Sequence, residues 1–106
     1  MKSQILRNEY LSKNINDPMD LDIESWLKII EQFITEQNFQ KAQDSIRMAL
    51  CINPYCAKLY VVLGDLQATL HQYDDAEKSY LEAIKISPND DLAKKNLQSL
   101  LTKKVN

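Results

Sequence analysis

Apolar residues recur at three- and four-residue steps along most of this chain, and short polar breaks separate the runs. Side chains three and four positions apart share one face of a helix, so each run predicts an amphipathic helix. Five runs follow one another, and we therefore expect five helices. Their apolar members are Leu21, Trp26, Ile29, Ile30 and Phe33; Phe39, Ala42, Ile46, Ala49 and Leu50; Leu59, Tyr60, Leu63, Leu66 and Leu70; Tyr73, Ala76, Tyr80, Ala83 and Ile84; and Ala93, Leu97, Leu100 and Leu101.

An internal repeat organises these helices. The residues Ala42, Ala49 and Pro54 recur 34 residues later, at positions 76, 83 and 88. A fixed period of this length indicates one supersecondary unit that has been copied and stacked. Within each copy only a two-residue break, 37–38 or 71–72, separates the helices, so we expect antiparallel helical hairpins.

Side-chain acceptors precede all three prolines, in Asp17-Pro18, Asn53-Pro54 and Ser87-Pro88. An acceptor of this kind can cap free backbone amides, and proline tolerates the first helical position because its missing N–H has no partner there. The three pairs therefore predict helix starts. Asn38 is the expected cap of the second helix.

Composition and charge exclude several functional classes. Lys and Arg number 13 and Asp and Glu number 15, which leaves a net charge of −2 and no general attraction to nucleic acid or anionic membranes. The longest apolar runs are too short to span a bilayer, and no signal peptide opens the chain. We expect a soluble protein of the cytoplasm or of an organelle interior, without membrane insertion.

The residue types that carry catalysis or bind metals do not gather in the sequence. Cys51 and Cys56 lack the spacing of a metal or redox pair, and His71 is the only histidine. The acidic pairs at 74–75 and 90–91 fit helix-start charges better than an acid–base pair. We expect no catalytic residues, no metal, no cofactor and no enzyme activity.

The two copies resemble the tetratricopeptide repeat, whose signature has a large residue, Leu, Gly and Tyr in its first helix and Ala, aromatic and Ala in its second. The second copy has Tyr60, Leu63, Gly64 and Gln67 at the first-helix positions, and its second-helix stretch YDDAEKSYLEAIKISPN at 73–89 is especially close to the family. The matching first-copy positions hold Trp26, Ile29, Ile30 and Phe33. Ile30 in the glycine slot implies wider local spacing or an unusual edge, and Gln67 in the aromatic slot implies a poorer seam.

The resemblance implies an all-α, right-handed helical-hairpin solenoid, with two repeats and a capping helix. We expect an N-terminal arm at 1–16, a first repeat at 17–55, a second at 56–89, and a capping helix with a tail at 90–106. The arm is either a short helix or frayed. Since two repeats make a short array, we expect the arm, a second copy or a partner to cover the open end.

The family resemblance also implies a binding face, because the first helix of each pair lines the inside of the curved stack. In this register the groove residues are Glu24, Leu27, Glu31, Ile34, Lys58, Val61, Asp65, Ala68, Thr69, Leu92, Lys95 and Ser99. The apolar members are either partly buried or covered by a partner. The second alternative predicts a groove with apolar walls and an acidic centre at Glu31 and Asp65, suited to a peptide or helix with an apolar anchor and a basic residue.

Some members of the family hold the C-terminal carboxylates of cytosolic heat-shock chaperones with Lys, Asn and Arg on the inner helices. The register places these slots at Leu27, Glu31, Val62, Leu92 and Asn96, and none carries the type required at its slot. Glu31 would repel a carboxylate. We therefore predict that this chain does not bind such carboxylates.

Two functions remain open. The first is a protein-binding adaptor or assembly factor, including a chaperone cofactor, that holds a partner segment in the groove. The alternative is a self-associating scaffold, such as a homodimer, that uses the exposed repeat end. Sedimentation over a range of concentrations distinguishes them.

Overall fold

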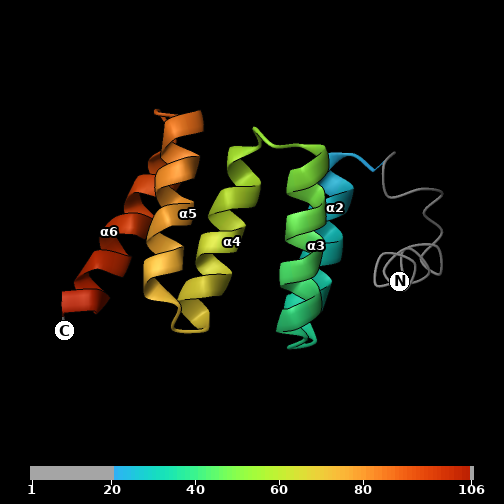
Figure 1. The fold of residues 1–106 in the computed structure, drawn as a ribbon, viewed down its shortest axis with the longest axis horizontal. Helices are drawn as coiled ribbons and strands as arrows, with labels where there is room; N and C mark the ends of the chain where they lie inside the picture. The colour runs from blue at the N-terminus through green and yellow to red at the C-terminus, as the bar shows by residue number, and fades with distance from the viewer. Residues whose placement is uncertain (1–20, 106) are drawn as a thin grey trace. The chain divides into compact units, whose positions relative to one another are not determined.

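The computed structural model describes residues 21–105, so the predicted N-terminal arm and the expected Asp17-Pro18 helix start lie outside it. The described part contains five α-helices and no strand, in agreement with the all-α prediction (Figure 1). The helices are α2 (Ile23–Thr35), α3 (Phe39–Ile52), α4 (Ala57–Thr69), α5 (Tyr73–Ile86) and α6 (Asp91–Val105).

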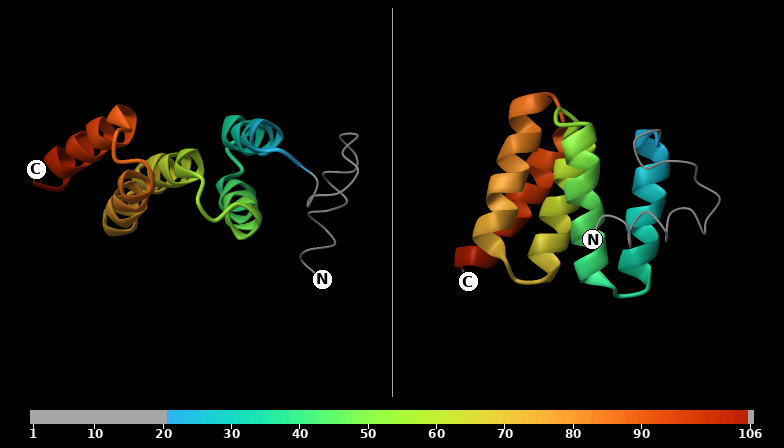
Figure 2. Two further views of the ribbon diagram at one scale, coloured as in Figure 1. Left: turned by 90° about the horizontal axis from the view of Figure 1, so that it is seen from above. Right: turned by 45° about the vertical axis from the view of Figure 1, so that its right-hand side comes forward.

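The described residues divide into two compact units, separated between Ile52 and Asn53, which we call unit 1 and unit 2. In unit 1, α2 and α3 form an antiparallel hairpin, and in unit 2, α4, α5 and α6 run in alternating directions as neighbours (Figures 1 and 2). The two-residue breaks found in the sequence are the places where the chain reverses. Most residues of the apolar faces predicted from the spacing are buried or partly buried, whereas Leu101 of the fifth run is 40% exposed.

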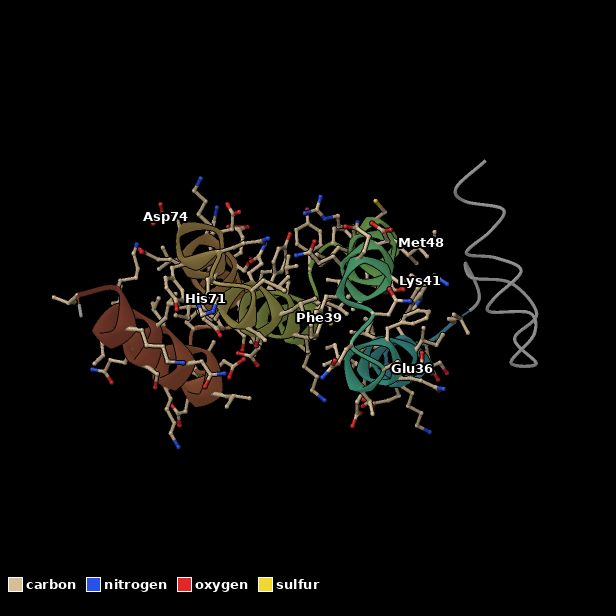
Figure 3. All side chains as sticks on the ribbon, turned by 90° about the horizontal axis from the view of Figure 1, so that it is seen from below. Glu36, Phe39, Lys41, Met48, His71 and Asp74 are labelled. Atoms are coloured by element: carbon tan, nitrogen blue, oxygen red, sulfur yellow. The ribbon has the colours of Figure 1, made fainter. Side chains whose placement is uncertain are left out.

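The core of unit 1 is built from both helices of the hairpin. Trp26, Ile30 and Ile46 are among the largest fully buried side chains, and Phe33 is also buried. The ammonium group of Lys41 lies 5.9 Å from the centre of the Phe33 ring, a cation–π distance. Figure 3 shows Lys41 on α3 and Glu36 just after the end of α2, on either side of the turn.

The core of unit 2 joins three helices. Its buried cluster contains one residue from α4, three from α5 and two from α6, namely Val61, Ala76, Tyr80, Ala83, Ala93 and Leu100. The four alanines of the 34-residue repeat, at positions 42, 49, 76 and 83, are fully buried. Their small side chains allow close approach of neighbouring helices, as the period predicts.

Both hairpin turns have the same backbone geometry. Gln37 and His71 occupy equivalent positions and adopt left-handed φ angles of 59° and 63°. Around Gln37, the amides of Asn38 and Gln37 donate to the carbonyls of Phe33 and Ile34 at 2.8 and 2.9 Å. This is a Schellman motif, which satisfies the last carbonyls of α2, and the turn after α4 repeats it.

Helix starts differ in part from the prediction. Pro54 and Pro88 lie in turns, three residues before the first residues of α4 and α6, so neither occupies a first helical position. Ser87 ends α5, and Asp90 begins the next helix by accepting from the amides of Leu92 and Ala93 at 3.1 and 3.2 Å. The Ser-Pro prediction was therefore wrong because Asp90, closer to the helix, provides the acceptor.

Two other helices begin at a side-chain cap, of which only Asn38 was predicted from the sequence. The Asp22 carboxylate accepts from the Ser25 amide at 2.8 Å and caps α2. Asn38 accepts from the Lys41 amide at 3.4 Å, which agrees with its predicted role at the start of α3.

The family's glycine and aromatic slots are filled differently in the two copies. In unit 2, Gly64 lies directly against the Tyr80 ring, whereas the equivalent unit 1 positions hold Ile30 and Ile46, both buried. In unit 1, two isoleucine side chains thus occupy the positions that a glycine and a tyrosine occupy in unit 2. Gln67 is buried, and its amide oxygen accepts from the Ser79 hydroxyl at 2.6 Å, so its polar group is satisfied.

Candidate functional site

A cleft of about 380 Å³ opens in unit 2 and is lined by α4, α5 and α6. Alanine and leucine side chains provide apolar walls, and a carboxylate, an amide, hydroxyls and an ammonium group provide polar contacts. The lining residues are Asp65, Ala68, Thr69, Tyr80, Asn96, Ser99, Leu100 and Lys103. Polar and charged residues therefore dominate this lining, and their groups converge from three helices on one concave surface, where such groups can orient a ligand.

Asp65 is the centre of a hydrogen-bond network that joins all three helices. Its Oδ1 atom accepts from the Tyr80 hydroxyl of α5, and also from Nδ2 of Asn96 on α6 at 3.0 Å. Both bonds meet at one oxygen, so they fix the orientation of the carboxylate. The site is therefore ordered before any guest enters.

The Tyr80 hydroxyl is held in its neutral, donating form. Burial, together with the hydrogen bond to Asp65 and the negative charge of that residue, raises the pKa of Tyr80 above its usual value of 10.0. Over the physiological pH range Tyr80 thus acts as a donor to Asp65.

Two adjacent lysines near the end of α6 have different surroundings. Lys104 pairs with Asp74 at 2.8 Å and with Glu77 at 2.7 Å, and these contacts connect the end of α6 to the first two turns of α5. The hydrogen bond between Lys104 and Asp74 raises the pKa of Lys104 and lowers the pKa of Asp74. Figure 3 shows Asp74 near the start of α5. Lys103 lines the cleft and has no ion pair with any residue between 21 and 105.

The structure brings together four of the predicted groove residues of unit 2, since Asp65, Ala68, Thr69 and Ser99 all line the cleft. Lys58, Leu92 and Lys95 are exposed but do not line it. Val61 was expected to be on the groove wall, but it is only 5% exposed and belongs to the buried cluster. Its position on α4 turns it towards α5 and α6, where it stabilises the unit.

In unit 1 the four predicted residues lie along α2. Glu24 and Glu31 are exposed, whereas Leu27 and Ile34 are partly buried. Glu31 borders a shallow depression of about 340 Å³, whose other lining residues are Lys28, Gln32, Thr35 and Glu36. All five residues belong to α2 or to its C-terminal cap, so this depression is less enclosed than the cleft of unit 2, which three helices line.

Sequence reasoning missed half of the cleft lining. Tyr80 and Leu100 were assigned to the core alone, Asn96 only to a carboxylate slot, and Lys103 to no site. Asn96, Ser99 and Lys103 follow one another at steps of three and four, so a longer stripe on α6 would have included them. Nothing in the spacing of α5 showed that the Tyr80 hydroxyl reaches Asp65.

Metal clusters, disulfides and membrane-spanning helices are absent from residues 21–105. Within 21–105 no three His, Cys, Asp or Glu side chains are placed to hold a metal ion. Cys51 and Cys56 are free thiols. None of the helices in this part of the chain has the length and apolar character needed to cross a bilayer.

Comparison with known proteins identifies the helical hairpins. The profile of the tetratricopeptide repeat matches residues 57–90. Two curated sequences of the Hsp70-Hsp90 organising protein, from Plasmodium falciparum and from its isolate 3D7, are each 35% identical over 96 residues, or 90% of this chain. The chain spans 36% of the length of the first and 16% of the second.

A solved structure shares the fold. The first tetratricopeptide-repeat domain of Spaghetti (RPAP3), bound to the HSP90 peptide SRMEEVD, superimposes with a TM-score of 0.68 and 18% sequence identity. The match covers 99% of this chain and 94% of that domain. Residues 57–90 are thus a tetratricopeptide repeat, and the helical hairpins of this chain have the fold of the tetratricopeptide-repeat family.

Proposed function

We propose that this chain is a non-enzymatic interaction module that binds a peptide segment or helix of another protein, as an adaptor, assembly factor or chaperone cofactor. The main observation is the unit 2 cleft, where Asp65, Tyr80 and Asn96 form an ordered polar network. A relative named for organising Hsp70 and Hsp90, and a similar domain with a bound HSP90 peptide, support this class of function.

The guest of this site is a segment with an apolar anchor and a basic residue. Ala68 and Leu100 offer apolar contacts within the cleft, and the Asp65 carboxylate offers a counter-charge. On α2, the exposed Glu31 carboxylate and the partly buried Leu27 and Ile34 give a second surface of the same chemistry. Glu24, Lys58, Leu92 and Lys95 are proposed as further contacts around these two surfaces.

A C-terminal carboxylate is a poor guest for the unit 2 cleft. Asn96 occupies a slot that serves such carboxylates in some relatives, but its amide group here donates to Asp65 at 3.0 Å. A second carboxylate at Asn96 would lie beside that of Asp65, and like charges at short range repel. Leu27, Glu31, Val62 and Leu92 also lack the donors that the other slots require.

This exclusion is tested with the peptide SRMEEVD, labelled at its N-terminus and followed by fluorescence anisotropy. We expect the free acid and the C-terminal amide to bind with the same affinity, because the terminal carboxylate makes no favourable contact in the cleft. Micromolar binding of the free acid alone would show that the cleft accepts carboxylates.

The proposed function itself is tested by site-specific photo-crosslinking. A photoreactive residue is placed at Thr69, which lines the cleft, or at Lys78, an exposed α5 residue that does not line it. Adducts formed in cell extract are mapped by mass spectrometry. We expect Thr69 adducts to map to a short segment of a small set of proteins and to disappear on Asp65→Lys. Identical adducts at both positions, or adducts unaffected by Asp65→Lys, would contradict the proposal.

Self-association is the alternative function, and one observation favours it. Leu101 and Val105 lie one helical turn apart on α6 and are 40% and 83% exposed. An exposed apolar pair at the end of a helical array suits contact with a second copy. Sedimentation velocity from micromolar to millimolar concentration tests this alternative, and a constant monomer sedimentation coefficient would exclude it.

A further inference from the structure

We infer that the unit 2 cleft binds an arginine side chain of the guest together with an acidic side chain two positions away, with Asp65 and Lys103 as the respective partners. This inference rests on the proposed function and specifies its guest. It depends on two charged groups that line the same cleft, the Asp65 carboxylate on α4 and the Lys103 ammonium on α6, which the sequence pattern did not place together.

Asp65 presents its remaining acceptors in a fixed direction. Tyr80 and Asn96 both donate to Oδ1, which leaves Oδ2 available to a guest. Since Nδ2 of Asn96 is used by Asp65, the amide oxygen of Asn96 is a further acceptor beside it. A guanidinium group carries five N–H donors in a planar fork, so it can satisfy several fixed acceptors at once. A lysine ammonium would satisfy fewer, and we therefore expect arginine to bind more tightly.

Lys103 gives the second half of the specificity. It lines the same cleft as Asp65, but the two do not form an ion pair with each other. A guest that brings only a cation would be repelled by Lys103, whereas a guest that also brings a carboxylate would be attracted by it. The neighbouring Lys104 does not offer the guest a second free positive charge, because Asp74 and Glu77 already neutralise it.

The helix geometry sets the spacing of the two guest charges. Lys103 follows Asn96 by seven residues, which is about 10 Å of rise along α6. In an extended peptide, residues two positions apart share a face and lie about 7 Å apart. The side chains of Lys103 and of the guest arginine are long and flexible, so they can bridge the difference between the separation along α6 and the separation along the peptide. A guest with arginine and glutamate at alternate positions therefore matches the cleft.

The test uses capped tripeptides as probes and the side-chain amide signal of Asn96 as the readout in NMR titrations of the full chain. The probes are acetyl-Arg-Gly-Glu-amide and acetyl-Glu-Gly-Arg-amide, which differ in direction, and acetyl-Arg-Gly-Gln-amide, which lacks the acid. We expect a saturable shift with at least one Arg/Glu probe, and at least threefold weaker binding of the Arg/Gln probe.

Substitutions assign each half of the site. Asp65→Asn should weaken the better Arg/Glu probe at least fivefold, and Lys103→Ala should remove its advantage over the Arg/Gln probe. The matched controls are Asp75→Asn on α5 and Lys94→Ala on α6, both exposed residues that do not line the cleft, and they should leave affinities within twofold.

Failure of this inference is distinct from failure of the proposed function. If no probe gives a saturable shift at 10 mM, or if Asp65→Asn leaves the affinity unchanged, the arginine assignment is overturned. Persistence of the Asp65-dependent Thr69 cross-link in that case would keep the peptide-binding function and exclude only this guest. Equal binding of Arg/Glu and Arg/Gln probes would overturn the role of Lys103.

Discussion

Gly64 of α4 lies directly under the ring of Tyr80 of α5, so close that a methyl group at position 64 would lie 2.7 Å from Cε1 and 2.8 Å from Cδ1. The hydroxyl of the same ring donates to Asp65, the residue after Gly64. One close helix contact thus fixes both the packing of unit 2 and the floor of its cleft. The ring has little freedom to move away, because the Tyr80 side chain is buried and its hydroxyl is hydrogen-bonded to Asp65.

Gly64→Ala should therefore destabilise the protein although alanine is the better helix former. The ring and the helices must shift, and overpacking of this kind costs about 1–3 kcal/mol. Urea denaturation monitored by circular dichroism measures the loss. A variant as stable as the wild type would show that α4 and α5 do not approach each other this closely.

The first repeat suggests a compensating pair, since the equivalent positions hold Ile30 and Ile46. Gly64→Ile overpacks the contact, and Tyr80→Ile leaves a cavity. In the double variant the larger residue at 64 fills the space left at 80, so its loss should fall short of the sum of the single losses by at least about 1 kcal/mol. Simple additivity would mean that the two positions are not coupled.

Tyr80→Phe removes the donor to Asp65 and preserves the packing against Gly64. We expect a loss of about 1–2 kcal/mol at pH 8, typical of a hydrogen bond to a charged group. Because the pKa of Tyr80 is raised in the folded state, its contribution is complete below pH 10 and is lost as pH rises further. Urea midpoints of both proteins measured between pH 8 and 11 should therefore converge. A gap that stays constant across this range would contradict the raised pKa.

Gln37→Gly should stabilise the protein by about 0.5–1 kcal/mol, because a left-handed φ of 59° strains a glutamine but not a glycine. His71→Gly at the equivalent turn should gain less, since Nδ1 of His71 lies 2.8 Å from the Tyr73 hydroxyl and the substitution removes that contact. Figure 3 shows His71 at this turn. Thermal melts of both variants provide the comparison, with Lys78→Gly in the middle of α5 as a destabilised control. Destabilisation by Gln37→Gly would rule out the left-handed turn.

Asp22→Ala should lower the melting temperature at pH 7 but have little effect near pH 2. The Ser25 amide hydrogen bond lowers the pKa of Asp22 below 3.8, so its stabilisation is present above that pH and is lost as pH falls through the lowered value. Asp22→Asn retains an uncharged acceptor, and its smaller loss should depend less on pH. A melting-temperature difference for Asp22→Ala that is the same at both pH values would argue against a charged cap.

The sequence was sufficient to predict the fold. The apolar spacing gave the five helices, and the 34-residue period gave the two hairpins and the four buried alanines. These features depend on local periodicity and on small residues at close contacts, both of which can be read along the chain. The starts of α4 and α6 were placed too early, because proline marks a turn as readily as a first helical turn.

The site was predictable only in part. The stripe on α4 gave Asp65, Ala68 and Thr69, since the face of a helix follows from residue numbers. The partners of Asp65 come from α5 and α6, and no periodicity within one helix shows which side chains meet between helices. Val61 shows the same limit, because it was predicted to lie in the groove stripe of α4, whereas packing against α5 and α6 buries it in the core.

The central claim is that the carboxylate of Asp65 in the unit 2 cleft holds a basic partner segment. It is tested most directly by the dissociation constant of the segment cross-linked at Thr69, measured for the wild type, Asp65→Lys, Glu31→Lys and the exposed α5 control Glu82→Lys. We predict at least tenfold weaker binding for Asp65→Lys, with an unchanged helical circular dichroism signal, a weaker effect for Glu31→Lys, and affinity within twofold of the wild type for Glu82→Lys. Equal affinities of Asp65→Lys and the wild type would contradict the claim.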